Sequence, residues 1–207
     1  MSVARDYFER TVLYKSEYGE RTIVLMQVGS FYEVYALLTD SGEMVGSNIL
    51  EFSTINDMVI SKKNTCVGKQ QVVMAGFGVP QLEKYTKKLQ EQDYTIVVYK
   101  QELQGKDIKR NVSEIFSPGT YFSQESTELS NNTMCIWLYK STASKYFSAQ
   151  MTVGISNIDI FTGKTSLFQY SIAYNHNPST YDELERYIAI YKPSECLIVS
   201  NMNDSLI

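Results

Sequence analysis

The stretch VGSFYEVY, residues 28–35, places three aromatic rings and one carboxylate within eight residues. Alternate side chains of a strand share one face, so Phe31 and Glu33 point together and Tyr32 points to the opposite face. A ring can stack on a flat ligand, and a carboxylate accepts hydrogen bonds. Because an unpaired buried acid is costly, Phe31 and Glu33 suit an exposed recognition site, whereas Tyr32 and Tyr35 suit the core.

A hairpin is predicted to position this pair. Residues 22–28 form a short β-branched run typical of a buried strand, and residues 31–38 form a second strand. Gly29 and Ser30 separate the two, and glycine at the first turn position suits a type II′ turn. Phe31 and Glu33 therefore lie beside a tight turn, where we expect the end of the strand to be exposed.

The rest of the first region alternates between helix and strand signals. A helix over residues 3–19 ends at Gly19 and carries Val12 in its apolar face. The other expected elements are a short helix over 47–58 capped by Ser47 or Asn48, an extended basic segment over 59–63, a strand over 71–80, a helix over 80–92, and strands over 94–101 and 110–119.

A polar segment over residues 123–132, with a single apolar residue, predicts a linker between domains over 1–122 and 133–207. The second domain shows three strand signals, a helix capped by Ser179 or Thr180, and a final buried strand over 195–200. The order β-β-β-α-β allows one parallel pair around the helix. Both domains are expected to be mixed α/β (α+β) folds.

Composition narrows the function classes. A hydrophobic fraction of 43% fits a packed globular protein, and the net charge of −4 gives no overall attraction to nucleic acid or to an anionic membrane. Cys66, Cys135 and Cys196 are widely spaced and odd in number, which indicates reduced thiols in an intracellular, reducing compartment. No membrane span, metal site or cofactor site is expected in this chain.

Two catalytic signals fail on inspection. Gly163, Lys164 and Thr165 resemble the end of a phosphate loop, but Ile158 stands where that loop needs its first glycine. Asp159 lies on a strand, yet a two-metal nuclease needs several convergent carboxylates. We therefore interpret Asp159 as an exposed strand residue and predict no catalytic residue.

At GSFYEVY the chain resembles the MutS family of DNA mismatch repair proteins, whose recognition motif is Gly-x-Phe-Tyr-Glu. The segments MAGFGVPQLEKYTKKLQEQDYTIVVYKQ and KRNVSEIFSPGT resemble later parts of the same family domain. The second region resembles the family's connector domain, which has an RNase H-like fold without nuclease activity. The sequence around the motif, YGERTIVLMQVGSFYEVY, is similar to those of the family subgroup found in giant viruses and octocoral mitochondria. The residues that match turn or structural motifs are Gly29, Ser30, Met74, Ala75, Gly76, Pro118, Gly119 and Thr120.

The resemblance implies that Phe31 stacks on a mispaired or unpaired base of double-stranded DNA from the minor groove, and that Glu33 hydrogen-bonds that base. It also implies ATP with magnesium, and a dimer, for the full-length protein, of which this chain is expected to be an N-terminal fragment without ATPase. Ser30 replaces the usual Asp, and one extra residue separates Gly76 from Pro80. The expected DNA-backbone contacts are Lys62, Lys63, Lys69, Lys84, Lys87, Lys88, Lys109 and Arg110, each as compatible with a solvated face.

Two other functions stay open from the sequence. The second region could be the active domain of an RNase H-like nuclease, which magnesium-dependent cleavage would reveal. Alternatively, the chain could be a protein-interaction module without DNA specificity.

Overall fold

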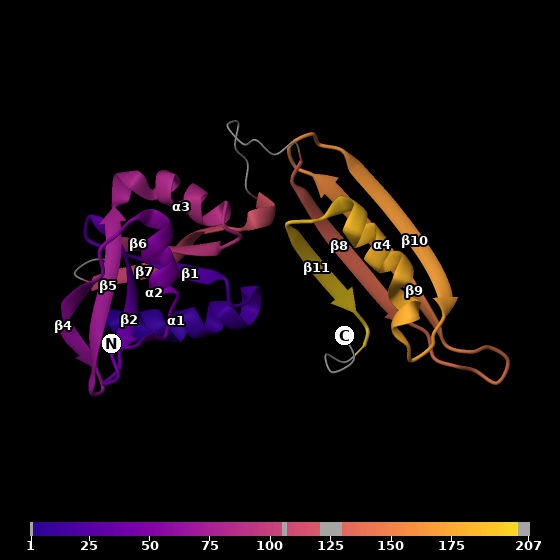
Figure 1. Ribbon diagram of the computed structural model, residues 1–207, viewed down its shortest axis with the longest axis horizontal. Helices are drawn as coiled ribbons and strands as arrows, with labels where there is room; N and C mark the ends of the chain where they lie inside the picture. Colours follow the sequence, from indigo (N-terminus) through magenta and orange to yellow (C-terminus); the bar gives the residue numbers. More distant parts are fainter. Residues whose placement is uncertain (1, 105–106, 121–129, 203–207) are drawn as a thin grey trace. The chain divides into compact units, whose positions relative to one another are not determined.

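The computed structural model describes residues 2–104, 107–120 and 130–202 (Figure 1). The chain divides into two compact units, Met1–Tyr121 and Phe122–Ile207. Both units combine helices with a mixed sheet, which confirms the predicted fold class. Within the described ranges, no helix is both long enough and apolar enough to cross a bilayer.

The first unit is organised around one seven-stranded sheet. Its elements are α1 (Val3–Tyr18), β1 (Thr22–Val28), β2 (Phe31–Leu38), β3 (Met44–Val45), α2 (Ile49–Asn56), β4 (Ser61–Val67), β5 (Gln70–Gly78), a 3₁₀ turn η1 (Val79–Gln81), α3 (Leu82–Gln90), β6 (Thr95–Gln104), β7 (Asp107–Phe116) and η2 (Pro118–Thr120). The strand order is β4-β5-β2-β1-β6-β7, and β3 pairs with β2. β1 and β6 are parallel, and the other pairs are antiparallel.

Helices cover both faces of this sheet. Tyr7 of α1 packs edge-on against Tyr35 of β2, with ring centroids 5.0 Å apart. On the opposite face, the ring of Phe77 of β5 lies against Phe52 of α2 and Tyr85 of α3. Because the central strands β1 and β2 are covered on both sides, their near-continuous apolar runs are buried.

Helix α1 begins and ends where the sequence predicts. Ser2 caps its N-terminus, and Gly19 follows it with a φ of 90°, a conformation that glycine adopts without strain. The predicted position of Val12 in the apolar face is wrong, since 69% of this residue is exposed. Thr11 takes the buried place, because its hydroxyl donates to the carbonyl oxygen of Tyr7 at 2.9 Å and so needs no water.

The second unit has the predicted β-β-β-α-β order. Its elements are β8 (Asn132–Lys140), β9 (Gln150–Asp159), β10 (Thr165–Ala173), a 3₁₀ turn η3 (Pro178–Tyr181), α4 (Asp182–Tyr191) and β11 (Glu195–Ser200). The sheet order is β10-β9-β8-β11, in which β8 and β11 form the expected parallel pair. Leu184 of α4 joins the core that Met134, Ile136 and Val153 form on one face.

Three expectations for the second unit are corrected. Strand β11 lies at the edge of the sheet and is not buried, since 63% of Leu197 is exposed. The helix cap moves upstream, because Asn177 accepts the N–H of Ser179 and η3 precedes α4. Of the predicted linker, residues 123–129 lie outside the described residues. Asn131 is buried and Asn132 begins β8, so the second unit starts before residue 133.

Candidate nucleic-acid interface

The hairpin that carries Phe31 and Glu33 turns through Gly29 and Ser30. Val28 pairs with Phe31 across the turn, which leaves a two-residue loop as predicted. Gly29 has a φ of 59° while Ser30 does not have a positive φ, as a type II′ turn requires. The backbone N–H of Val79 donates to the carbonyl oxygen of Ser30 at 2.9 Å, so the start of η1 braces the turn.

A polar network holds the same turn from the other side. The N–H of Gly29 donates to Oε1 of Gln101 at 3.1 Å, and the N–H of Gln101 donates to Oε1 of Gln27 at 2.9 Å. Arg110 Nε donates to the carbonyl oxygen of Gln27 at 2.8 Å. Gln27 and Gln101 were not predicted from the sequence, because their contacts join strands that are distant in the chain.

Phe31 stands exposed at the end of this braced strand. Phe31 is 55% exposed, whereas the next five residues of β2 are buried. Its pairing partner on β5 is Gly78, which has no side chain to cover the ring. Phe31 therefore offers an accessible aromatic face on a rigid support.

Glu33 shares that face of β2 but lies in a different environment. Only 8% of this residue is exposed, so the expected exposure of the carboxylate is wrong. The hydroxyl of Tyr35 and the ammonium of Lys63 both donate to its Oε2. Burial raises the pKa of Tyr35, and the hydrogen bond to Glu33 raises it further, so this hydroxyl stays protonated. These two donors explain how the acid tolerates burial.

The Met74-Ala75-Gly76 motif forms the part of β5 that runs beside Glu33. Gly76 pairs with Glu33, and a Cβ at Gly76 would lie 2.3 Å from the carbonyl oxygen of Tyr32. Only glycine therefore permits this approach of the two strands.

The Pro118-Gly119-Thr120 motif forms the turn η2 after β7. The Thr120 hydroxyl donates to the carbonyl oxygen of Ser117 at 3.0 Å, and Gln90 Nε2 donates to the same oxygen at 2.8 Å. The role of this motif in the described contacts is thus to attach the end of β7 to α3.

The structure does not bring the eight predicted basic residues together. Lys63 forms an ion pair with Glu33. Lys69 precedes β5 at the end opposite Phe31, and a rise of ~3.3 Å per strand residue places the two about 30 Å apart. The α3 lysines Lys84, Lys87 and Lys88 belong to the layer that covers Phe77, and Lys87 pairs with Glu83 at 3.0 Å. Lys62 is exposed on β4.

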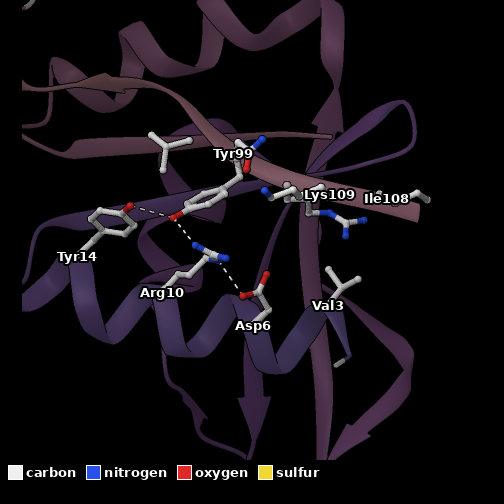
Figure 2. Close-up of a pocket in the computed structure, with 10 residues that line it drawn as sticks. Val3, Asp6, Arg10, Tyr14, Tyr99, Ile108 and Lys109 are labelled. Atoms are coloured by element: carbon white, nitrogen blue, oxygen red, sulfur yellow. Dashed lines mark hydrogen bonds and ion pairs between the residues drawn. The ribbon is translucent and has the colours of Figure 1, made fainter. Parts of the chain in front are cut away.

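Lys109 and Arg110 line a cleft of about 540 Å³ between α1 and β7. Figure 2 shows its centre, where Arg10 donates to Asp6 at 2.8 Å and to the hydroxyl of Tyr99 at 2.7 Å. Burial raises the pKa of Tyr99 to about 12, so its hydroxyl remains neutral. These contacts attach α1 to the sheet next to Lys109 and Arg110. The i,i+4 spacing of Asp6 and Arg10 in the sequence is typical of an ion pair on a helix, and it could have identified these two residues.

The sequence of the chain is similar to those of one protein family. The family model of MutS domain I matches residues 8–125, more than half of the 207-residue chain. A mutS homologue of Acanthamoeba polyphaga mimivirus is 24% identical over 196 residues, which cover 93% of this chain and 17% of that protein.

Bacterial proteins are similar to the chain as well. The DNA mismatch repair protein MutS of Parabacteroides distasonis is 28% identical and covers 85% of this chain and 18% of its own length. That of Clostridium beijerinckii is 26% identical and covers 93% and 18%. The chain thus spans less than a fifth of the length of these relatives, over an alignment that includes most of both units. The chain belongs to the MutS family of DNA mismatch repair proteins.

Proposed function

We propose that this chain recognises a mispaired or unpaired base in double-stranded DNA, with Phe31 as the stacking residue. The observation that carries the proposal is the exposed ring of Phe31 at the tip of a strand whose next five residues are buried. An inserted apolar ring unstacks a base step and kinks the duplex, which costs least where pairing is already defective. The names of the MutS relatives support this choice of partner.

Glu33 is proposed to accept a hydrogen bond from the displaced base. An ionised carboxylate accepts hydrogen bonds and donates none, so a free carboxylate oxygen favours sites that present a donor. Lys109 and Arg110 are proposed to contact the DNA backbone, because they lie at the Phe31 end of the sheet. ATP, magnesium and a dimer are proposed for the longer family members by resemblance alone, and the chain itself is proposed to have no catalytic turnover.

The test is the substitution Phe31→Ala in the 207-residue chain, with binding measured by fluorescence anisotropy. The probes are a duplex with one unpaired base and its matched control, at about 50 and 200 mM salt. Loss of one aromatic stack should weaken binding to the defective duplex by ~1–3 kcal/mol, or about 5- to 150-fold, and leave the matched duplex nearly unchanged.

Phe147→Ala provides a matched control, since Phe147 is an exposed phenylalanine of the second unit. It should leave both affinities unchanged. Equal losses on the two duplexes with Phe31→Ala would make Phe31 a general contact and would refute the proposed role.

The nuclease alternative loses support from the environment of Asp159. Its Oδ1 accepts the backbone N–H groups of Asn131 and Phe161, and its Oδ2 accepts the hydroxyl of Thr162 at 2.5 Å. Asp159 is buried, so its predicted exposure is wrong. Among the described residues, no group of three or more His, Cys, Asp or Glu side chains is placed to hold a metal ion. Magnesium-dependent cleavage that Asp159→Asn abolishes would restore the alternative.

A further inference from the structure

Two side chains converge on one oxygen of Glu33. Tyr35 lies two residues further along β2 and donates its hydroxyl to Oε2. Lys63 lies on β4 and donates to the same atom, and its ammonium also lies 3.1 Å from the Tyr35 hydroxyl and 4.7 Å from the centre of that ring. The three groups therefore form one compact charged cluster.

The sheet is built to allow this reach. Strand β5 lies between β4 and β2, and at the position opposite Glu33 it carries Gly76. Neighbouring strands lie about 4.8 Å apart, so Lys63 must cross the width of β5 to reach the carboxylate. Because Gly76 has no side chain, nothing at that position of β5 blocks the crossing.

The cluster is asymmetric. Both donors go to Oε2, and among the described residues no hydrogen bond to Oε1 of Glu33 is found. Tyr35 is fully buried, whereas 28% of the Lys63 side chain and 10% of the Glu33 side chain are exposed, so the cluster lies at the edge of the core. The carboxylate thus has one oxygen fixed by the protein and one oxygen available to a ligand.

We propose that Tyr35 and Lys63 are positioning residues: Tyr35 orients the Glu33 carboxylate and Lys63 cancels its charge, so that Oε1 can accept a hydrogen bond from the base. This inference rests on the proposed function of Phe31 and Glu33. It assigns Lys63 a role other than the phosphate contact expected from the sequence: with Lys63 in place the pair is neutral toward the DNA backbone, and without it a bare carboxylate faces the phosphates.

The test compares Lys63→Met in two backgrounds, the native chain and Glu33→Gln. Affinities for the matched duplex and for the duplex with one unpaired base are measured by anisotropy at about 50 mM salt. In the native background, Lys63→Met should weaken binding to both duplexes about tenfold, because the carboxylate is left uncompensated. In the Glu33→Gln background this charge is gone, so the loss should shrink to about twofold. Lys62→Met, on the same strand and exposed, should give equal small losses in both backgrounds.

Tyr35→Phe separates orientation from charge. It removes one hydroxyl, keeps the buried ring and leaves the net charge unchanged. The matched duplex should bind as before, while the preference for the unpaired base should fall about threefold. This variant also carries the test if Lys63→Met does not fold, which circular dichroism would reveal.

Equal losses for Lys63→Met in both backgrounds would overturn the inference, since Lys63 would then be an independent phosphate contact. An unchanged preference in Tyr35→Phe would overturn the orienting role. Failure of the proposed function is a separate result, because it is read from Phe31→Ala, whereas the coupling of Lys63 to Glu33 is read on the matched duplex.

Discussion

Glu33 in the first unit and Asp159 in the second are two acids with the same exposure and different surroundings. Each belongs to a strand beside a hairpin turn, and each is 8% exposed. Asp159 uses both oxygens on donors around its own turn and the start of β8. Glu33 uses one oxygen on Tyr35 and Lys63.

Exposure alone therefore does not identify an acid that recognises a ligand. An acid whose acceptors are filled by the backbone it stabilises is committed to the fold. An acid held at one oxygen by side chains from two strands is fixed in place and still has acceptor capacity. Substitutions of the residues around Glu33, of Asp159 itself and of the ring of Phe31 should separate these two kinds of acid.

The largest expected effect is at the close strand contact beside Glu33. Gly76→Ala would place a Cβ 2.3 Å from the carbonyl oxygen of Tyr32, so β5 or β2 must move. The free energy of unfolding should fall by about 3 kcal/mol, at the upper end of ordinary overpacking. Urea denaturation followed by circular dichroism measures the change.

Gly78→Ala is the matched control on the same strand. A Cβ at Gly78 would lie 3.8 Å from Cδ of Pro80, an ordinary contact, and its φ is not positive. Its stability should be unchanged or increased by up to about 0.5 kcal/mol. Similar losses for the two alanines would mean that the tight contact is absent in solution.

An intermediate effect is expected for Asp159→Ala, which removes the acceptor that the turn requires. The hydrogen bonds from Thr162 and from the backbone N–H groups of Asn131 and Phe161 lower the pKa of Asp159. At pH 7 the substitution should reduce the stability of the second unit by about 1–2 kcal/mol.

The pH dependence follows from the direction of this shift. The folded pKa lies below the unfolded value of about 3.9, so the contribution of Asp159 is complete well above pH 3.9. It is lost as the pH falls through the lowered folded pKa. Urea titrations of native chain and variant between pH 7 and about pH 2.5 should therefore converge at the acid end, and a constant difference would contradict the ionised role.

The smallest expected effect is that of Phe31→Ala on stability. Since 55% of Phe31 is exposed and Gly78 lies opposite, its ring contributes little to the core. The free energy of unfolding should change by less than about 0.5 kcal/mol. A loss above about 2 kcal/mol in urea would instead make Phe31 a core residue.

Local features were predictable from the sequence. The Gly29-Ser30 turn, the helix end at Gly19 and the shared face of Phe31 and Glu33 each depend on neighbours within a few residues. The same reasoning failed for Val12, because a threonine that hydrogen-bonds its own helix displaced it from the buried face.

Contacts between distant strands were not predictable. The Lys63–Glu33 pair depends on the register of β4, β5 and β2, and the Arg10–Tyr99 contact depends on a parallel pair formed late in the chain. Burial of β11 was mispredicted for a related reason. An apolar strand is buried only if other strands or helices pack on it. The composition of β11 does not show that it lies at the edge of its sheet.

The parallel pairing of β1 with β6 has a consequence for the order of folding. The hairpin of β1 and β2 closes locally, but Thr22 finds its partner Thr95 only after two helices and three further strands have been made. Such non-local pairing is slow, because the entropy of closing the long loop is lost before the stabilising contacts form. During synthesis, β1 therefore keeps an open edge of unpaired backbone groups until β6 emerges. During that interval the open edge of β1 can pair with another chain.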